Sequence, residues 1–313
     1  MPDLSVVIPT YRRHGLLART LDRLEAQVLP RGVSFEAIVV DDPNEDDTEL
    51  VAAAVGDRPY PVRQLSRLAV GVAAARNRGW RAAGADLVLF LGDDVLADRR
   101  LLDEHLAWHR KHPRDEIGVL GKVRWAREER ITPFMHWLEH GVQFDYHRIV
   151  GIDAGWGRFY TTNVSVKRGA LERVGGFDEA FPFGYEDLEI AKRMHAQLGF
   201  RLLYNDKARV EHLHPTTLQD WCRRMAQVAV AEHRFVAKHP DVPPYFRDML
   251  LRASSLPPAR GRGAPLVKLV PRAVPWLGER IWTSADTWYR QQLAPPFLAV
   301  WERMDREEGT TAE

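Results

Sequence analysis

The sequence predicts an α/β fold in which a doubly wound, mostly parallel sheet is followed by a C-terminal helical extension. Strand-like runs alternate with helical patterns over the first 91 residues, as they do in sheets built from strands and crossover helices. The 313 residues are 45% hydrophobic and 28% charged, which is enough to bury a full core. Acidic residues follow several strand-like runs, where ligands of open α/β sheets collect.

The elements of the first half follow from short apolar runs separated by helical patterns. The first helix begins after Pro9-Thr10-Tyr11, and the second is rich in alanine. The apolar face of the first helix is formed by Leu16, Leu17, Thr20, Leu21 and Leu24. Strands are expected at 4–8, 35–40, 62–65 and 87–91, and the alanine-rich helix at 72–83.

Strands are harder to place after residue 125, where Trp, His and Gly become frequent. Thr217 and Asp220 resemble a capping box that begins a helix ending near His239. Residues 256–275 are rich in Pro, Gly and basic side chains, which predicts a loosely held loop before Trp-rich helices that reach about residue 308. Four prolines, Pro271, Pro275, Pro295 and Pro296, are expected to break this last region into short pieces.

Composition excludes several classes of function. Lys and Arg number 44 against 43 Asp and Glu, so the net charge of +1 gives no reason to expect a nucleic-acid partner. Cys222 is the only cysteine, which excludes an intramolecular disulfide and a cysteine-rich zinc site. No run of ~18 apolar residues occurs, and the first strand starts by Leu4 without a leader, so we expect a cytoplasmic protein.

Two acidic pairs carry the expected chemistry. Asp93-Asp94 follows the most apolar strand, and Glu186-Asp187 lies between a Gly-aromatic turn and a helical pattern. Hard divalent cations such as Mg²⁺ and Mn²⁺ are commonly held by one or two carboxylates plus substrate phosphates. We therefore expect Asp94 to bind a cation, Asp93 to face a ribose, and the second pair to move a proton. Simple capping of helix N-termini by both pairs is the alternative.

Other polar residues after strands favour nucleotide binding. Asp41 and Asp42 could accept a hydrogen bond from a base N–H, and Thr10 could contact the same nucleoside. Arg76 and Asn77 lie on the alanine-rich helix, from which a guanidinium can reach a base or a phosphate. The alternatives are a solvated turn at Asp41-Asp42 and a solvated Arg76.

Seven short motifs follow one another along the chain. They are Pro9-Thr10-Tyr11-Arg12-Arg13, Val39-Val40-Asp41-Asp42, Ala74-Ala75-Arg76-Asn77, Phe90-Leu91-Gly92-Asp93-Asp94-Val95, Asn163-Val164-Ser165, Gly175-Gly176-Phe177-Asp178-Glu179 and Glu186-Asp187. Their order and spacing resemble the inverting family 2 glycosyltransferases of GT-A fold, over residues 3–235. No single motif is decisive, but seven in order are specific. The resemblance implies transfer of a sugar from a nucleotide-sugar donor to an acceptor hydroxyl, usually with Mn²⁺ or Mg²⁺.

The resemblance implies a role for each matched residue. Asp94 matches the metal-binding last acid of the family's D-x-D motif and Asp93 its ribose-side partner, whereas Gly92 departs from the acid that the family more often has. Asp187 matches the catalytic base, and Glu186 resembles residues that hold the acceptor or its loop. The nucleotide site would comprise Pro9, Thr10, Tyr11, Arg13, Asp41, Asp42, Arg76, Asn77 and Asp93, and the acceptor pocket Trp156, Tyr160, Asn163 and Tyr185.

A histidine near residue 212 is expected to complete the metal site. Val210-Glu211-His212 resembles an element that donates a third metal ligand in some GT-A enzymes. His212 is the expected ligand, and His214 is expected to point to the opposite face. The choice between these two histidines stays open at this stage.

The implied mechanism is direct displacement with inversion. Asp187 would take the acceptor proton, and the cation at Asp94 would stabilise the departing diphosphate. A UDP-sugar is favoured over a GDP- or dTDP-sugar, with a saccharide or a lipid-linked acceptor. Residues 1–125 would bind the donor, 126–240 the acceptor, and 241–313 would form a Pro/Trp-rich helical extension; the oligomeric state is not predicted.

Two other functions compete with this one. They are a retaining GT-A glycosyltransferase and a catalytically silent nucleotide-sugar-binding protein. A sugar-phosphate nucleotidyltransferase would need a Gly-rich loop after the first strand, and this chain has none there.

Basic and aromatic residues are interleaved between 256 and 308, a mixture typical of peripheral membrane helices. We expect this stretch to contact the inner face of a membrane or a lipid-linked acceptor. Packing of its Trp residues onto the protein is the alternative. The residues concerned are Arg260, Arg262, Lys268, Arg272, Arg280 and Arg290, with Leu266, Leu269, Val270, Trp276, Ile281, Trp282 and Trp288.

Overall fold

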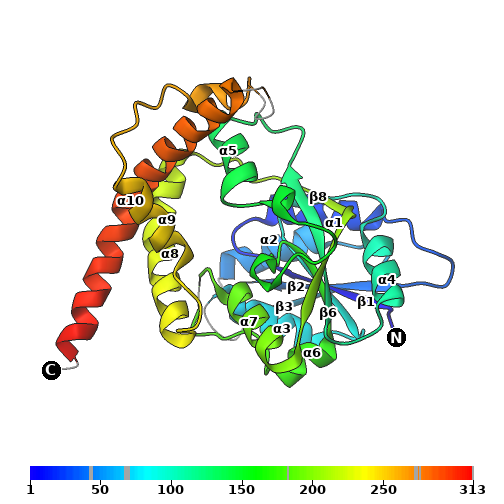
Figure 1. Cartoon of the computed structure of the whole chain (residues 1–313). Coiled ribbons are helices and arrows are strands. Elements are labelled where there is room, and N and C mark those ends of the chain that lie inside the picture. The colour runs from blue at the N-terminus through cyan, green and yellow to red at the C-terminus, as the bar shows by residue number, and fades with distance from the viewer. Residues whose placement is uncertain (42–44, 67–70, 182, 271–273, 275, 312–313) are drawn as a thin grey trace. The chain divides into compact units, whose positions relative to one another are not determined.

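The computed structural model describes residues 1–41, 45–66, 71–181, 183–270, 274 and 276–311 (Figure 1). Contacts divide the chain into two compact units. Unit 1 comprises Met1–Glu128, Tyr146–Pro182 and Glu186–His214, and unit 2 comprises Glu129–Asp145, Phe183–Tyr185 and Pro215–Glu313. The predicted division at residues 125 and 240 stays a prediction.

Unit 1 is built on a mixed sheet whose strand order is β3-β2-β1-β4-β7-β6-β8-β5. β1 pairs in parallel with β2 and β4, β2 with β3, and β6 with β8. β7 runs antiparallel to β4 and β6, and β5 antiparallel to β8. The strands are β1 Leu4–Pro9, β2 Phe35–Asp41, β3 Val62–Ser66, β4 Leu87–Leu91, β5 Val95–Ala97, β6 Ile117–Trp125, β7 Asn163–Lys167 and β8 Arg201–His212. The α/β fold and the first four strands are therefore as predicted.

Helices cover both faces of this sheet. Val164 and Val166 of β7 belong to a core that also contains Trp80 of α3 and Met194 of α7. Ser165, between the two valines, is hydrogen bonded to α4, so α4 lies on the opposite face. The helical segments of unit 1 are α1 His14–Glu25, α2 Glu45–Val55, α3 Val72–Ala82, α4 Leu101–Lys111, η1 Tyr146–Arg148, η2 Trp156–Arg158, α6 Arg168–Arg173 and α7 Glu186–Leu198.

Gly79 allows α3 to lie close to the sheet. A Cβ atom built at Gly79 would stand 2.3 Å from Cγ1 of Val7, at the centre of β1. No other residue type fits this distance without displacing the strand or the helix. This packing fixes the position of Arg76 and Asn77 relative to the ends of the parallel strands.

Unit 2 is helical. It contains α5 Pro133–Gly141, α8 Leu218–Lys238, α9 Tyr245–Ser254, η3 Ala264–Leu266 and α10 Leu277–Thr311. Figure 1 shows α10 running alongside α8 and α9, with which it packs. Thr217 accepts a hydrogen bond from the Asp220 N–H, and the Asp220 side chain bonds back to the Thr217 N–H, which confirms the predicted capping box. In the described part of the chain, no helix is both long enough and apolar enough to cross a membrane.

The prediction that four prolines break the last region into short pieces is wrong for Pro295 and Pro296, because both lie inside α10, whereas Pro271 and Pro275 lie outside the described residues. A proline has no N–H, so the carbonyl of Gln292 loses the helical donor that position 296 would supply. The thiol of Cys222 donates to this carbonyl instead, at 3.5 Å. Burial of Leu293 and Phe297 on either side of the two prolines stabilises the continuous helix.

Candidate active site

The first part of the site forms where β1 and β4 end side by side. Thr10 follows β1, and its hydroxyl donates to Oδ2 of Asp93 at 2.8 Å. Nη1 of Arg13, just before α1, lies 3.2 Å from Asp93 Oδ1 and 2.6 Å from Asp94 Oδ2. Both carboxylates are buried. The structure thus brings together Thr10, Arg13 and Asp93, predicted for the nucleotide site, and Asp94, predicted as the metal ligand.

Thr20 of α1 fixes the turn that carries the acidic pair. Its hydroxyl oxygen lies 2.9 Å from the carbonyl oxygens of both Asp93 and Val95, and it accepts the Val95 N–H at 3.2 Å. The sequence pattern predicts Thr20 only as part of the apolar face of this helix. A lone hydroxyl among leucines was the signal for this role, because a buried hydroxyl needs a partner.

Asp94 and two histidines form a group able to hold a cation. β5 pairs with the end of β8, and the Leu213 N–H donates to the Asp94 carbonyl at 2.7 Å. Nε2 of His212 lies 3.2 Å from Asp94 Oδ1, and Nδ1 of His214 lies 3.6 Å from Oδ2. One ligand atom from each of the three residues falls within 4.8 Å of the other two. The arrangement fits one divalent cation, with a carboxylate and two imidazoles as donors.

The expectation that His214 points to the opposite face is wrong. Alternate residues of an extended chain lie on the same face, so His212 and His214 both reach Asp94. Their rings stack with centroids 5.4 Å apart. The geometry therefore keeps both histidines as candidate ligands.

The two neighbouring acids have opposite electrostatic surroundings. Burial and the Asp94 carboxylate raise the pKa of Asp93 to about 6, against the opposing charge of Arg13. Burial alone would also raise the pKa of Asp94, but His212, Arg13 and His214 lower it to about 2. Asp94 is thus held ionised, as a metal ligand must be.

The second acidic pair forms the first turn of α7. Oε1 of Glu186 accepts a hydrogen bond from Arg76 Nη1 at 2.6 Å, and both side chains are largely buried. Oε2 of Glu186 is buried and has no hydrogen-bond partner within the described ranges. Arg76 is thus placed as a partner of the second acidic pair, and Glu186 keeps one acceptor atom for another molecule.

Asp187 has the properties expected of a base near neutral pH. Its Oδ1 accepts the Leu188 N–H at 2.9 Å, and the Thr161 backbone also hydrogen bonds to its carboxylate. Burial and the adjacent Glu186 carboxylate raise the pKa of Asp187 to about 7. A base is most effective when its pKa is close to the working pH.

A short segment, residues 161–162, joins the two acidic pairs. The Gly92 N–H donates to the Thr162 carbonyl at 3.2 Å, next to Asp93-Asp94. Thr161 bonds to Asp187, as described above. A Cβ atom at Gly92 would lie 3.0 Å from Asp94 Oδ1 and 3.5 Å from Thr162 Cγ2. Glycine at position 92 therefore leaves room for the Asp94 carboxylate beside this segment.

Asp41 lies at the end of β2 and is buried. Its Oδ2 accepts a hydrogen bond from Gln64 Nε2 at 2.6 Å. Oδ1 has no hydrogen-bond partner among the residues that the structure describes. Asp42 lies outside the described residues.

Asn77 and Asn163, both predicted as substrate contacts, are buried and bonded within the protein. Asn77 donates to the Phe177 carbonyl and to Glu179, and accepts from the Phe177 N–H and the Trp80 indole. Asn163 donates to the Ala208 carbonyl and pairs with His105 of α4. Both amides are therefore already hydrogen bonded and shielded from solvent, and their contact with a substrate stays a prediction.

Of the remaining predicted residues, four belong to unit 1 and one belongs to unit 2. Trp156 and Tyr160 are half-buried and pack against the core, with the Lys192 ammonium 5.8 Å from the centre of the Trp156 ring. Tyr11 is exposed after β1, and Pro9 is the last residue of that strand. Tyr185 belongs to unit 2.

Comparison with known proteins agrees with the resemblance. The model of the family described as glycosyl transferase family 2 matches residues 5–175. Validoxylamine A glucosyltransferase of Streptomyces hygroscopicus subsp. limoneus is 32% identical over 277 residues, covering 78% of this chain and 58% of its own. Pre-mycofactocin glycosyltransferase of Mycobacterium tuberculosis (strain CDC 1551 / Oshkosh) is 30% identical over 254 residues, covering 76% and 48%. The chain thus spans about half to three fifths of the length of these relatives.

Two solved structures share the fold. TarS 1–349 of S. aureus, in complex with UDP, aligns with a TM-score of 0.53 and 16% identity over 98% of this chain and 92% of its own. The mannosyltransferase PcManGT from Pyrobaculum calidifontis, in complex with GDP-Man and Mn²⁺, aligns with a TM-score of 0.57 and 18% identity over 99% and 79%. The predicted GT-A architecture is confirmed by this likeness. Since the family match spans more than half of the 313 residues, the chain belongs to glycosyl transferase family 2.

Proposed function

We propose that the chain is a metal-dependent glycosyltransferase that moves a sugar from a nucleotide-diphosphate-sugar donor to an acceptor hydroxyl with inversion. One observation carries the proposal: Gly92, two residues before the proposed metal ligand Asp94, and the carboxylate of Asp187 both hydrogen bond to residues 161–162. A cation-binding group beside a carboxylate of near-neutral pKa provides the two functions that direct displacement at an anomeric carbon requires.

Asp94, His212 and His214 would hold the cation. A donor set with two imidazoles suits Mn²⁺ better than Mg²⁺, which prefers oxygen ligands in octahedral geometry. PcManGT, which shares the fold, was solved with Mn²⁺ and supports this choice. A bound Mn²⁺ would neutralise charge that develops on the leaving diphosphate.

The donor nucleotide would lie along the ends of β1, β2 and β4. Oδ1 of Asp41 can accept a base N–H, and Asp93 can accept ribose hydroxyls. Arg13 is half-exposed beside both acids and can contact phosphate. UDP in TarS and GDP-Man in PcManGT support donors of both kinds. We favour UDP-glucose as the first donor to test, because the relative from Streptomyces is a glucosyltransferase.

Asp187 would act as the base. It would accept the proton of an acceptor hydroxyl as the oxygen attacks the anomeric carbon, and Glu186 would hold that acceptor through its second oxygen. The acceptor would be a saccharide or another polyol, bordered by Trp156 and Tyr160. Aromatic faces suit the C–H surfaces of sugars.

Titration calorimetry tests the donor site. UDP and GDP should bind wild type tightly only when Mn²⁺ is present, and Asp94→Ala should weaken both Mn²⁺ and nucleotide at least about tenfold. Asp98→Ala, at an exposed acid four residues away, is the matched control and should bind as wild type does. Tight nucleotide binding by wild type without any divalent cation would contradict the proposal.

The anomeric configuration of the product separates inversion from retention. An inverting enzyme yields a product with the opposite configuration to the donor sugar, which NMR of the product reads directly. A retained configuration would remove Asp187 as base and favour the retaining alternative. Binding of UDP or GDP with Mn²⁺, but no turnover with any donor, would favour the catalytically silent alternative.

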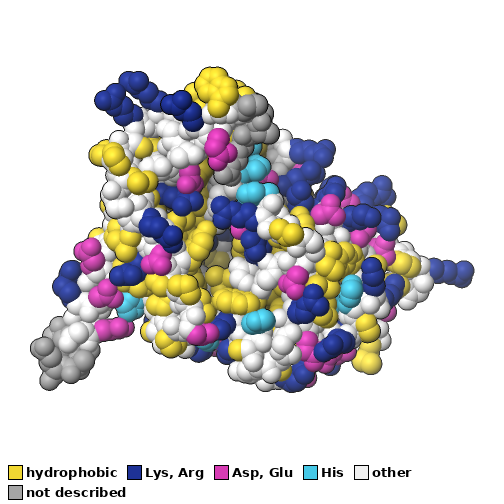
Figure 2. Space-filling model, viewed as in Figure 1, with side chains coloured by type: hydrophobic (Ala, Val, Ile, Leu, Met, Phe, Trp, Pro, Cys, Tyr) yellow, Lys and Arg dark blue, Asp and Glu magenta, His cyan; other side chains and the backbone are white. Residues whose placement is uncertain are grey.

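We also propose that the chain before and at the start of α10 contacts an anionic lipid surface. Leu269 and Trp276 are 74% and 73% exposed, whereas Trp282 and Trp301 are buried in unit 2. Figure 2 shows Lys and Arg side chains together with hydrophobic ones on the surface over this stretch. The exposed basic residues described here are Arg260, Arg262, Lys268 and Arg280, and Arg272 lies outside the described residues.

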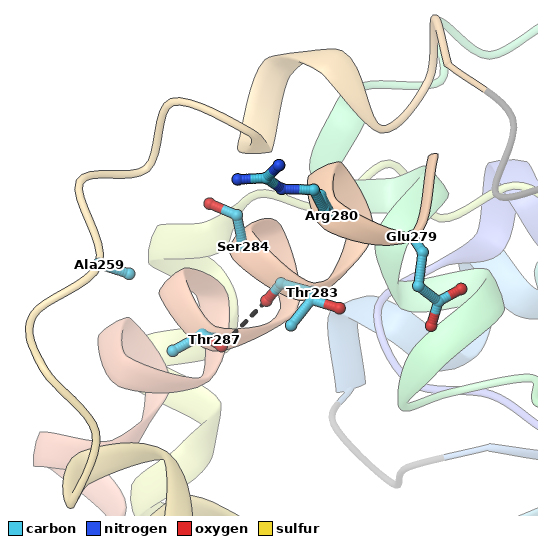
Figure 3. A pocket seen from close by; sticks show the side chains of 6 residues that line it. All are labelled: Ala259, Glu279, Arg280, Thr283, Ser284 and Thr287. Carbon is cyan, nitrogen blue, oxygen red and sulfur yellow. Dashed lines mark hydrogen bonds between the residues drawn. The ribbon is translucent and has the colours of Figure 1, made fainter. Parts of the chain in front are cut away.

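A depression on α10 belongs to the same surface. It is lined by Ala259, Glu279, Arg280, Thr283, Ser284 and Thr287. Figure 3 shows Arg280 and Ser284 projecting from α10 on the side of Ala259, and Glu279 projecting on the other side. A guanidinium beside hydroxyls is suited to a lipid phosphate. Compared with wild type, the double variant Leu269→Ser/Trp276→Ser should co-sediment less with phosphatidylserine vesicles, whereas the control Leu251→Ser should co-sediment equally. Equal pelleting of wild type and both variants would rule the lipid contact out.

A further inference from the structure

Two histidines and a glutamate share one face of α5 in unit 2. They belong to the run His136-Trp137-Leu138-Glu139-His140, in which His136, Glu139 and His140 are three and four residues apart. Residues at this spacing are neighbours on the surface of a helix. One potential ligand atom from each of the three falls within 4.8 Å of the other two. The group lies wholly in unit 2 and shares no residue with the Asp94 group.

Another face of α5 anchors the helix within unit 2. Phe134 and Trp137 are buried, and Trp137 Nε1 donates to Oδ1 of Asp286 on α10 at 3.1 Å. At the start of the helix, the Thr132 hydroxyl oxygen accepts the Met135 N–H at 3.2 Å and caps it. The backbone beneath the three polar side chains is therefore fixed, and side-chain rotation alone can bring their ligand atoms together.

The two imidazoles are packed against each other and against one indole. The ring centroids of His136 and His140 are 4.5 Å apart. The ring of Trp282 on α10 lies 5.5 Å from the first and 5.8 Å from the second. Trp282 is buried, and its Nε1 donates to the Val270 carbonyl at 3.4 Å. Rings restricted in this way lose less conformational entropy when they bind a ligand.

One hydrogen bond sets the tautomer of His140. Its Nδ1 lies 2.9 Å from the backbone carbonyl oxygen of His136. A carbonyl oxygen can only accept, so Nδ1 carries the proton and the lone pair of the neutral ring is on Nε2. Histidines that bind metals almost always donate their other ring N–H to a carbonyl, a carboxylate or a water. The ring is thus already in the tautomer that a metal ligand at Nε2 requires.

We propose that His136, Glu139 and His140 form a metal site, separate from the Asp94 group, that takes Zn²⁺ or a similar transition-metal ion. Two imidazoles and one carboxylate are a donor set that suits Zn²⁺, whereas Mg²⁺ and Ca²⁺ prefer oxygen ligands. Zn²⁺ bonds to these ligands are about 2.0–2.2 Å long, so tetrahedral ligand atoms stand ~3.4 Å apart. Rotation of the three side chains closes the present spacing to that value.

The site has two chemical consequences. Three protein ligands leave the fourth position of a tetrahedral ion open, and water fills that position in sites of this kind. The ion would also bridge consecutive turns of α5, because its ligands are three and four residues apart. The proposal therefore gives unit 2 an ion-binding role of its own, and it does not depend on the function proposed for unit 1.

Hydrogen–deuterium exchange of the full chain tests the site in wild type. Amides of residues 136–142 should exchange at least about tenfold more slowly with Zn²⁺, because the ion must leave before the bridged turns open. The same concentration of Mg²⁺ should not change their exchange. In His136→Gln/His140→Gln, Zn²⁺ should give no such protection. Exchange at 136–142 in wild type that does not respond to Zn²⁺ would overturn the proposal.

Competition with a chromophoric chelator measures how many Zn²⁺ ions bind tightly. Wild type should hold one more equivalent than His136→Gln/His140→Gln, whether or not the Asp94 group also takes Zn²⁺. Glu139→Gln should keep that equivalent but weaken its binding at least about tenfold. His147→Gln, at an exposed histidine of unit 1, is the control and should bind as wild type does. Equal numbers of tight equivalents in wild type and in the double variant would contradict the site.

Discussion

At the scale of single residues, the site holds carboxylates in two different states. Asp94 lies among a guanidinium and two imidazoles, so its pKa is low and it stays ionised. Asp187 is half-buried beside the Glu186 carboxylate, and this surrounding raises its pKa towards neutrality. Groups whose surroundings drive their pKa values apart divide the roles of metal ligand and proton acceptor between them.

Asp187→Asn keeps the shape of the side chain and removes the proton acceptor. Turnover of the donor should fall by about 10²- to 10⁴-fold, whereas binding of UDP and Mn²⁺ should stay as in wild type. Steady-state assays and calorimetry measure the two quantities. Asp206→Asn, at an exposed acid of unit 1, is the control. Turnover within about threefold of wild type would exclude Asp187 as the base.

The pH dependence of turnover should report the same group. Because the base must be ionised to accept a proton, kcat is expected to rise with pH through about 7 and to fall below it. A stopped assay of UDP release between about pH 5.5 and pH 8.5 measures the profile. The residual activity of Asp187→Asn should no longer rise with pH near 7. If kcat of that variant still rises there, the titration belongs to another group.

At the scale of elements, β7 separates two chemically different layers. Val164 and Val166 enter the apolar core with α3 and α7. On the other face, the Ser165 hydroxyl oxygen lies 2.8 Å from His105 Nδ1 and 2.9 Å from His109 Nε2 of α4. Burial lowers the pKa of His105 to about 4 and that of His109 to about 3, so both histidines are neutral in the folded protein.

These histidines should make the fold sensitive to acid. In the unfolded chain they protonate near pH 6.5, whereas in the folded protein they do so only near pH 4 or below. The unfolded state therefore binds more protons below pH 6.5, and the free energy of unfolding should fall by up to ~1.4 kcal/mol per pH unit for each histidine. Urea denaturation at pH 7, 6 and 5 measures the slope. The slope should be smaller in His109→Gln and unchanged in His147→Gln.

The glycine pair before Phe177 allows a matched test of the turn that Asn77 holds. Gly175 and Gly176 have φ of +79° and +81°, so alanine is strained at both. Only at Gly176 would the new Cβ atom collide, 2.5 Å from Asn77 Oδ1. Gly176→Ala should lower the free energy of unfolding by about 1–3 kcal/mol more than Gly175→Ala, as measured by urea denaturation. Equal losses of unfolding free energy in the two variants would show that the Asn77 side chain moves aside without a measurable cost.

At the scale of the whole molecule, the sequence predicted what depends on local pattern. β1, β2 and β4 are marked by apolar runs, because strands buried on both faces need them. β3 is half-buried, and Val62 and Leu65 were its only apolar signal. β6 and β8 carry charged residues and pair with distant strands, so no local period marked them. The contact of Asp187 with residues 161–162 was also out of reach, because it depends on the antiparallel position of β7 in an otherwise largely parallel sheet. The prediction for His214 was wrong because alternate residues of an extended chain lie on the same face, so His214 lies beside His212.

The alternation along β7 also limits how this chain can be re-engineered. One residue inserted between 162 and 163 would shift the register of β7 by one position. Asn163 and Ser165 would then face the valine core, and the two valines would face the histidines. A longer or shorter chain before residue 161 leaves the alternation intact. Segments of different length from relatives could therefore be grafted upstream of Thr161 and rejoined at this strand. The strand would act as a fixed junction at which these segments can be exchanged while the two acidic pairs keep their common support.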